Sequence, residues 1–308
     1  MSPIASASIW FAGQVGPVRA AVLMVCACAG FAAMMAIVRL IAPEVHPVQA
    51  AFFRNFFGVL FMLPWLVRAG GTGALRTGRP GMHVVRSVLG LTAMLLLFSA
   101  LGMLPLADVT ALSFTAPLFA TAGAALVLRE QVGRRRWTAT LVGFLGAIVI
   151  LRPDADTFTP EALVALGSAA AIAAAQLSVK ALSRTENPNA MVLIMGLLMT
   201  PMSLLPALFV WTWPSADTFA WIVLMGAVAT VGQLCLVRAM AIADASAVMP
   251  FDFARLIFAA LLGWLMFGEW PDGWTWVGAA VIVASTVYIA RREAKRARRA
   301  PAAVPPET

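Results

Sequence analysis

The sequence predicts an all-α membrane protein with ten transmembrane helices in two inverted five-helix repeats. Two observations lead to this prediction. Ten apolar stretches follow one another along the 308 residues, and short sequence echoes relate the first five stretches to the last five. The composition agrees, because 61% of the residues are hydrophobic and only 12% are charged, whereas soluble domains carry about a quarter charged residues.

Each apolar stretch predicts one membrane-spanning helix, since about 20 residues at 1.5 Å per residue cross the hydrocarbon core. In chain order, the predicted spans are residues 18–38, 47–67, 84–103, 107–128, 137–151, 160–181, 190–211, 218–238, 246–267 and 274–290. The fifth and tenth spans are short, and we expect flanking Arg and Trp side chains to extend them to the interface. The alternating segments of about 10 residues that indicate a β-barrel are absent from the sequence.

The internal duplication rests on matching segments in the two halves. Residues 107–111 (ADVTA) echo residues 243–247 (ADASA), and each segment opens an apolar stretch that ends at a glutamate, Glu130 or Glu269. A Trp follows each glutamate after seven residues, before the last apolar stretch of its half. Because five spans is an odd number, the second half must enter the membrane with opposite polarity. The duplication is therefore an inverted repeat, a pattern typical of secondary transporters.

These features divide the chain into four parts. We predict a cytoplasmic N-terminal tail (residues 1–17), a first five-helix repeat (18–152), a second five-helix repeat (153–290) and a basic cytoplasmic C-terminal tail (291–308). Residues 1–17 lack the basic region and cleavage site of a signal peptide, so we expect the first helix to be retained.

The basic residues indicate the orientation. With the N-terminus in the cytoplasm, the cytoplasmic loops and flanks carry 18 of the 22 Lys and Arg residues, with Arg86 and Lys180 counted among them. The outer side receives only Arg39 and Arg152. This positive-inside bias predicts a multi-pass protein of a bacterial-type inner (plasma) membrane, with both termini cytoplasmic and the basic tail beside anionic lipid. The distribution argues against nucleic acid as a partner, despite a net charge of +8.

Three charged side chains lie deep in the predicted spans: Arg54, Asp252 and Arg255. Charge in hydrocarbon is costly unless it faces protein or a water-filled cavity, so we predict that all three converge on one cavity between the halves. Arg54 is expected to bind a carboxylate, a phosphate or an aromatic face of the substrate. The alternative is a structural Arg that holds backbone carbonyls or pairs with Asp252.

Asp252 and Arg255 are three residues apart and share a helix face, so they can neutralise each other. The alternative is that this face lines the cavity, where Asp252 would bind a substrate amine or exchange a proton. Pro250, just upstream, is expected to kink the span and free a backbone carbonyl toward the cavity.

Uncharged polar residues complete the candidate substrate-binding set. Asn55 points about 100° away from Arg54 around the helix, and we expect it to bond a neighbouring helix, with ligand contact as the alternative. The same two interpretations apply to Gln176 and Gln233. Four aromatic residues of the second span are expected to contact the core or lipid, with stacking on an aromatic substrate as the alternative: Phe52, Phe53, Phe56 and Phe57.

No metal, cofactor or disulfide is expected. The chain has only two histidines, His46 and His83, so it offers no cluster of metal ligands. Its three cysteines, Cys26, Cys28 and Cys235, all fall within predicted spans, where a thiol is usually a packing residue.

Over roughly residues 18–290 the chain resembles the drug/metabolite transporter superfamily, EamA type. The resemblance is carried by residues 51–57 (AFFRNFF), 113–128 with Pro117, 130–153 and 243–278. Residues 51–54, 79–86 and 267–272 look most like a branch that contains S-adenosylmethionine uptake carriers. The resemblance implies ten helices in two inverted repeats and movement of small organic solutes by alternating access.

The predicted function is therefore secondary transport of a small organic metabolite, with S-adenosylmethionine-like or amino-acid-like solutes as the expected substrates. The alternative is an integral-membrane enzyme that acts on a small or lipid substrate. Against it, the sequence contains no Gly-x-Ser-x-Gly, His-Glu-x-x-His or P-loop motif. A monomer and a homodimer both remain open.

Overall fold

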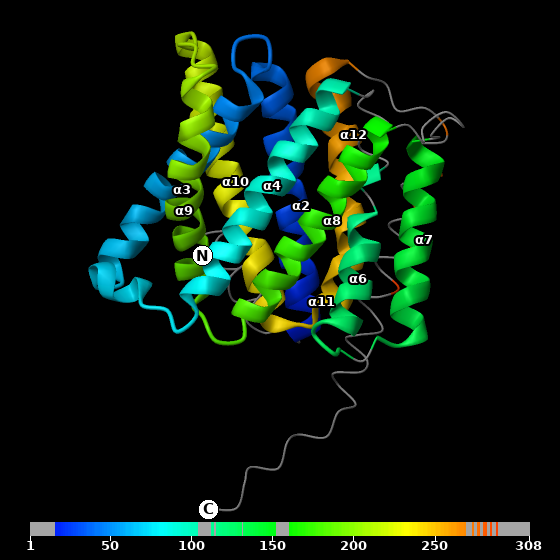
Figure 1. The fold of residues 1–308 in the computed structure, drawn as a ribbon. Helices are drawn as coiled ribbons and strands as arrows, with labels where there is room; N and C mark the ends of the chain where they lie inside the picture. The colour runs from blue at the N-terminus through cyan, green and yellow to red at the C-terminus, as the bar shows by residue number, and fades with distance from the viewer. Residues whose placement is uncertain are drawn as a thin grey trace, which may run out of the picture.

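The computed structural model describes residues 16–103, 112–151 except 114 and 131, 160–268, and seven single positions between 273 and 288. Within these residues every regular element is helical, and the helices stand side by side as a bundle (Figure 1). Six of them are long and apolar enough to cross a membrane: α2 (Gly16–Ile41), α3 (Pro47–Arg68), α4 (Pro80–Met103), α8 (Pro160–Leu182), α9 (Pro188–Leu208) and α10 (Ala216–Ile242). The prediction of an all-helical, multi-pass membrane protein is confirmed at this level.

The other predicted spans are described in part. The fourth and fifth correspond to α6 (Ala116–Leu126) and α7 (Arg134–Leu151), and a short 3-10 helix, η1 (Gly71–Leu75), follows α3. The tenth span, 274–290, lies outside the described residues except for single positions, as do most of the two tails. The number of ten crossings therefore stays a prediction.

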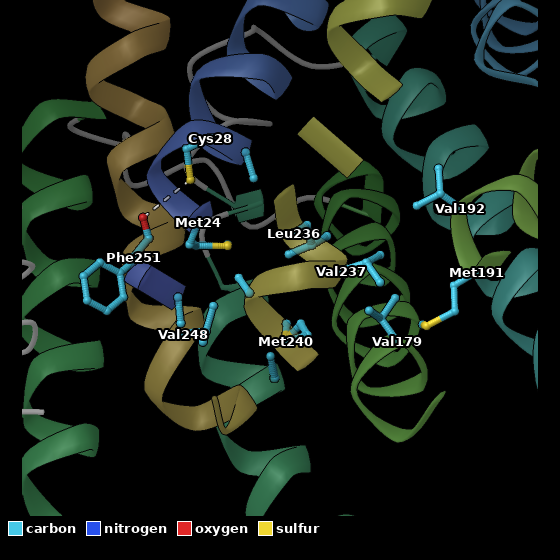
Figure 2. Close-up of a cluster of buried hydrophobic side chains, with 14 of the residues drawn as sticks. Met24, Cys28, Val179, Met191, Val192, Leu236, Val237, Met240, Val248 and Phe251 are labelled. Atoms are coloured by element: carbon cyan, nitrogen blue, oxygen red, sulfur yellow. Dashed lines mark hydrogen bonds between the residues drawn. The ribbon is translucent and has the colours of Figure 1, made fainter. Parts of the chain in front are cut away.

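The ninth predicted span is broken. It consists of α11 (Ala245–Val248), the 3-10 helix η3 (Met249–Phe253) and α12 (Ala254–Phe267). Pro250 lies at the start of η3, where a residue without an N–H interrupts the α-helical hydrogen bonds. The carbonyl of Phe251 accepts a hydrogen bond from the Cys28 thiol of α2 at 3.5 Å (Figure 2). The kink predicted at Pro250 is thus a change of helix type that is packed against α2.

A buried apolar cluster joins segments of both halves around this break (Figure 2). Methionines and branched aliphatic side chains fill it, as expected for an interior without polar partners. Its members include Met24, Cys28, Val179, Met191, Val192, Leu236, Val237, Met240, Val248 and Phe251.

The long helices pair across the two halves. α2 packs against α10, α4 packs against α8, and α3 packs against α9. Glycines allow the first of these pairs to approach closely. A Cβ atom on Gly30 would lie 3.0 Å from the carbonyl oxygen of Val228 and 3.1 Å from Cα of Gly232. Small residues of this kind let helix backbones approach within a membrane.

Replacing Gly30 with Val is expected to destabilise the α2–α10 pair by about 1–3 kcal/mol, because the added carbons meet backbone atoms that cannot move aside. Thermal unfolding of the purified protein in detergent would measure the loss. Gly81→Val is the matched control, since a Cβ atom there has nothing within 4 Å. Equal unfolding temperatures for the two variants would contradict the close packing of α2 on α10.

Candidate substrate site

A cavity of about 190 Å³ lies inside the bundle, among α2, α3, α4, α8, α9, α10 and the start of α12. Its wall combines a few strong hydrogen-bond donors with a soft apolar surface. The described polar residues that line it are Arg54, Arg86, Arg255, Gln176 and Gln233. The methionines that line it are Met34, Met35, Met94, Met195, Met199 and Met225. Both halves of the chain therefore contribute to one internal site.

Arg54 reaches the cavity from α3, one residue before Asn55. Its Nη1 donates to the side-chain oxygen of Asn55 at 3.0 Å. Asn55 is 2% exposed and was expected to bond a neighbouring helix, but its oxygen is bonded within α3 because the long Arg54 side chain curls back to it. Asn55 lines a second cavity of about 20 Å³, together with Arg54, Thr230 and Gln233. The amide thus orients Arg54 beside the main cavity.

The carboxylate of Asp252 pairs with Arg255. Arg255 Nη2 donates to Asp252 Oδ2 at 2.9 Å across three residues, from α12 to η3. This contact is the neutralising pair considered from the sequence, and Arg54 is bonded to Asn55 instead of to Asp252. Arg255 lines the cavity, whereas Asp252 is buried at 2% exposure and is not one of the described lining residues. Of the three charged candidates, two therefore face the same cavity, and Asp252 reaches it through Arg255.

Arg86 is the cavity residue that the sequence analysis missed. It was counted with the charges of the cytoplasmic flanks, because it is only the third residue of the predicted span 84–103. The helix begins at Pro80, so Arg86 lies more than a turn inside it and is 2% exposed. Its Nη1 donates to the carbonyl of Met191 at 2.9 Å, and its Nη2 has no hydrogen-bond partner among the described residues. The proline was the available signal, since Pro favours the first position of a helix.

Lys180 was assigned to a cytoplasmic flank in the same way and is also buried, at 7% exposure. Its Nζ donates to the carbonyls of Met240 at 3.0 Å and Ala243 at 2.6 Å. These carbonyls belong to the C-terminal end of α10, where a cation is favourable because of the helix dipole. The prediction of three deeply placed charges was therefore wrong. Arg86 and Lys180 are also buried, because hydrogen bonds to backbone carbonyls offset the cost of removing their charges from water.

The phenylalanines of α3 pack on one another and not on the cavity. The rings of Phe52 and Phe53 are 5.4 Å apart, and Trp211 lies 5.4 Å from Phe53. Phe56 and Phe57 continue the cluster. None of the four is among the described lining residues, and Phe56 is 38% exposed, so the geometry favours contact with the core or lipid over stacking on a substrate.

Two hydrogen-bonded contacts join loops of the two halves at opposite ends of the bundle (Figure 1). At one end, Glu44 Oε2 accepts the Ser215 backbone N–H at 2.9 Å, and the Gln49 side chain bonds the backbone of Thr212. These bonds from Ser215 hold the pKa of the Glu44 carboxyl below its usual range. At the other end, Thr77 Oγ1 donates to Glu186 Oε1 at 2.6 Å. We call these the Glu44 clasp and the Glu186 clasp.

The chemistry of the cavity is that of a binding site. Three guanidinium groups and two amides can donate hydrogen bonds to acceptor oxygens, and methionine sulfurs make favourable contacts with flat aromatic rings. The carboxylate of Asp252 pairs with one of these arginines, Arg255. Among the described residues, no group of three or more His, Cys, Asp or Glu could hold a metal ion.

A bundle of apolar helices around an internal polar cavity has the architecture of an integral-membrane transporter. The family model described as "EamA-like transporter family" matches residues 18–152 and again residues 159–291. The chain belongs to the EamA-like transporter family.

Its relatives include carriers of two different metabolites. It is 42% identical to a riboflavin transporter of Vibrio cholerae over 252 residues, which cover 81% of this chain and 84% of that protein. An S-adenosylmethionine uptake transporter of Rickettsia prowazekii is 32% identical over 252 residues, covering 82% and 85% of the two chains. One crystal structure superposes with a TM-score of 0.72 at 19% identity, covering 88% of this chain and 98% of the other, and shows the fold alone.

Proposed function

We propose that this chain is a secondary carrier of a small organic metabolite and that riboflavin is the substrate its cavity fits best. The observation that carries the proposal is the wall of the cavity, where arginines and amides stand among six methionines. The isoalloxazine ring of riboflavin is flat and presents carbonyl oxygens and ring nitrogens along one edge. Arginine and amide donors suit that edge, and methionine side chains suit the faces of the ring.

The charge of the wall favours riboflavin over S-adenosylmethionine. The described charged residues that line the cavity are three arginines, and the Asp252 carboxylate already pairs with Arg255. S-adenosylmethionine carries a sulfonium and an ammonium group beside one carboxylate, so its net charge is positive, and the arginines would repel the two cations at short range in a medium of low dielectric constant. Riboflavin is neutral and rich in acceptors. We therefore propose a flavin-like solute ahead of the S-adenosylmethionine-like or amino-acid-like solutes expected from the sequence.

Counterflow in liposomes tests the proposed function. Vesicles that contain the purified chain and unlabelled riboflavin are expected to take up labelled riboflavin, and S-adenosylmethionine should compete weakly. Exchange of S-adenosylmethionine without exchange of riboflavin would overturn the argument from charge. If neither compound is exchanged, the proposed function is wrong.

The size of the cavity supports alternating access. A volume of about 190 Å³ is below the roughly 300–1,000 Å³ of sites that hold drug-sized ligands. The helices must therefore separate before a flavin can enter. Separation at one end would break the Glu44 clasp, and separation at the other end would break the Glu186 clasp. In the predicted orientation, the Glu44 clasp closes the outer end and the Glu186 clasp closes the cytoplasmic end.

The pairing of the helices supports the inverted repeat. Exchange of the first five predicted spans with the last five carries the α2–α10 pair onto the α8–α4 pair and carries α3–α9 onto itself. The clasps follow the same relation. Each glutamate lies shortly before a helix that begins with a capping side chain and a proline, His46-Pro47 in α3 and Asn187-Pro188 in α9. The same contact, between a glutamate and a loop of the other half, would then close each end.

Opposite effects on access are expected when the two clasps are weakened. Glu44→Gln should open the outer end and Glu186→Gln the cytoplasmic end, because a neutral amide accepts weaker hydrogen bonds than a carboxylate. The measurement is the rate at which an impermeant maleimide, added outside, labels a Val38→Cys variant that lacks Cys26 and Cys235. Val38 lines the cavity one turn from the end of α2. Changes in the same direction for both glutamate variants would contradict two separate gates.

Acidic pH should act on the outer end through the same group. Because the clasp lowers the pKa of Glu44, its contribution to closure is present above the ordinary carboxyl pKa and is lost as the pH falls through the lowered value. Acidifying the outer solution should therefore raise the labelling rate of the protein with Glu44 relative to that of the Glu44→Gln variant, because the loss of thiolate at low pH slows both equally.

A further inference from the structure

A cluster of buried polar side chains lies near the start of α4. His83, Arg86 and Ser87 are 1%, 2% and 0% exposed. Positions three and four residues apart share one face of a helix, so the three side chains lie together. Both ring nitrogens of His83, the Nη2 of Arg86 and the Oγ of Ser87 have no hydrogen-bond partner among the described residues.

Such a concentration of unpartnered atoms calls for a physical reason. A neutral imidazole has one donor and one acceptor, and leaving both buried without partners carries their full desolvation penalty. Native proteins keep few such groups, and those that persist are commonly associated with water, ions or proton transfer. Histidine is also the side chain whose charge changes most readily near neutral pH.

The cluster connects the substrate cavity with one end of the bundle. Toward the cavity, the same face of α4 continues through Arg86 to Gly90, which both line the wall. Toward the end of the bundle, α4 begins at Pro80, shortly after Thr77 of the Glu186 clasp. Glu186 is held there by the Thr77 hydroxyl, as part of the Glu186 clasp. His83 thus lies between the substrate site and a proposed gate.

We propose that His83 is the proton-binding site that couples riboflavin transport to a proton gradient, an inference that rests on the proposed function. A proton reaches the ring from the cavity by way of Ser87 and is held while Glu186 is near. The charged groups around this path are Glu186 from the α8–α9 loop, Arg86 from α4, and Arg54 of α3, which lines the same cavity as Arg86. When the clasp opens and Glu186 moves away, repulsion by Arg86 favours release of the proton to water at that end.

The test separates coupling from exchange in liposomes with the membrane voltage clamped. With an outside-acidic gradient, the unsubstituted chain should accumulate riboflavin up to about tenfold per pH unit for one proton per substrate. His83→Gln should lose this accumulation and keep counterflow without a gradient. His46→Gln is the matched control, because it replaces the other histidine of the chain, which caps α3 outside the cluster, and it should retain both activities.

Every outcome decides the proposal. Accumulation by His83→Gln at the level of the unsubstituted chain would overturn it, and so would a chain that exchanges riboflavin but ignores the gradient. Loss of counterflow in His83→Gln would assign the ring a structural role unless Ser87→Ala, a smaller change on the same path, selectively slows gradient-driven uptake. Absence of counterflow in the unsubstituted chain would instead remove the proposed function.

Discussion

Arg54→Lys is expected to lower riboflavin counterflow by about 10- to 100-fold while the protein stays folded. A hydrogen bond to a charged group contributes about 1.5–3 kcal/mol, which corresponds to that range. Lysine keeps the positive charge, but it lacks the planar fork that can hold two acceptor atoms of a ring edge. Its three donors also share one nitrogen, so it cannot contact Asn55 from one nitrogen and the cavity from another, as the guanidinium does.

The control for this substitution is Arg68→Lys, at the exposed C-terminal end of the same helix. Both variants are measured for thermal unfolding and for the concentration dependence of counterflow. We expect the Arg54 variant to need more substrate for half-maximal exchange, since the lost contact is made to the bound ring. Exchange at the unsubstituted rate and affinity would show that Arg54 does not hold the substrate.

The order and approximate positions of the helices were predictable because membrane spans are long and apolar. Where helices begin was less predictable, and α4 shows the consequence. Hydropathy places its start after the polar residues near His83, whereas Pro80 begins the helix. A shift of four residues in the start of the helix moved Arg86 from the flank of the span to more than a turn inside it, where it lines the cavity. The positive-inside rule misplaces residues of this kind, because hydrogen bonds to backbone carbonyls offset the cost of burying their charge.

The pairing of helices was not predictable from apolar periodicity. A membrane helix is apolar toward lipid as well as toward protein, so its sequence marks no core-facing stripe. The close approach of α2 and α10 depends on Gly30 and Gly232, which look like any other small residues in the sequence. The residues of the site were easier to predict, because a charged side chain within a membrane span must face protein or a water-filled cavity. Arg54, Arg255 and Gln176 were all selected from the sequence, and all line the cavity.

The helical-wheel argument for Asn55 was wrong for a related reason. Residues one apart point in different directions at Cβ, but an arginine is long enough to bend around the helix to its neighbour. Methionines were not identified from the sequence either, because in an apolar chain a cavity-lining methionine has the same pattern as a core methionine. Only the arrangement in space separates Met199 on the cavity wall from Met191 in the core.

Asp252→Asn is expected to lower the stability of the protein by about 3–5 kcal/mol, the cost of removing one partner from a buried ion pair. The carboxylate is 3% exposed and the Arg255 side chain 23%, so the loss should fall toward the lower end. The amide can still accept a hydrogen bond, but it no longer offsets the charge of the guanidinium. Thermal unfolding in detergent, with and without riboflavin, measures the effect.

A second substitution separates the two roles that the sequence left open for this pair. In the double variant Asp252→Asn with Arg255→Met, no charge remains to be compensated, and stability should largely return. If the pair serves only the packing of η3 against α2, riboflavin counterflow returns with it. If Arg255 also donates to the substrate from the cavity wall, counterflow stays low although the protein is again stable. Recovery of neither property would mean that Asp252 acts through contacts other than its bond to Arg255, with the Cys28 thiol, 3.8 Å from Oδ1, as the first to examine.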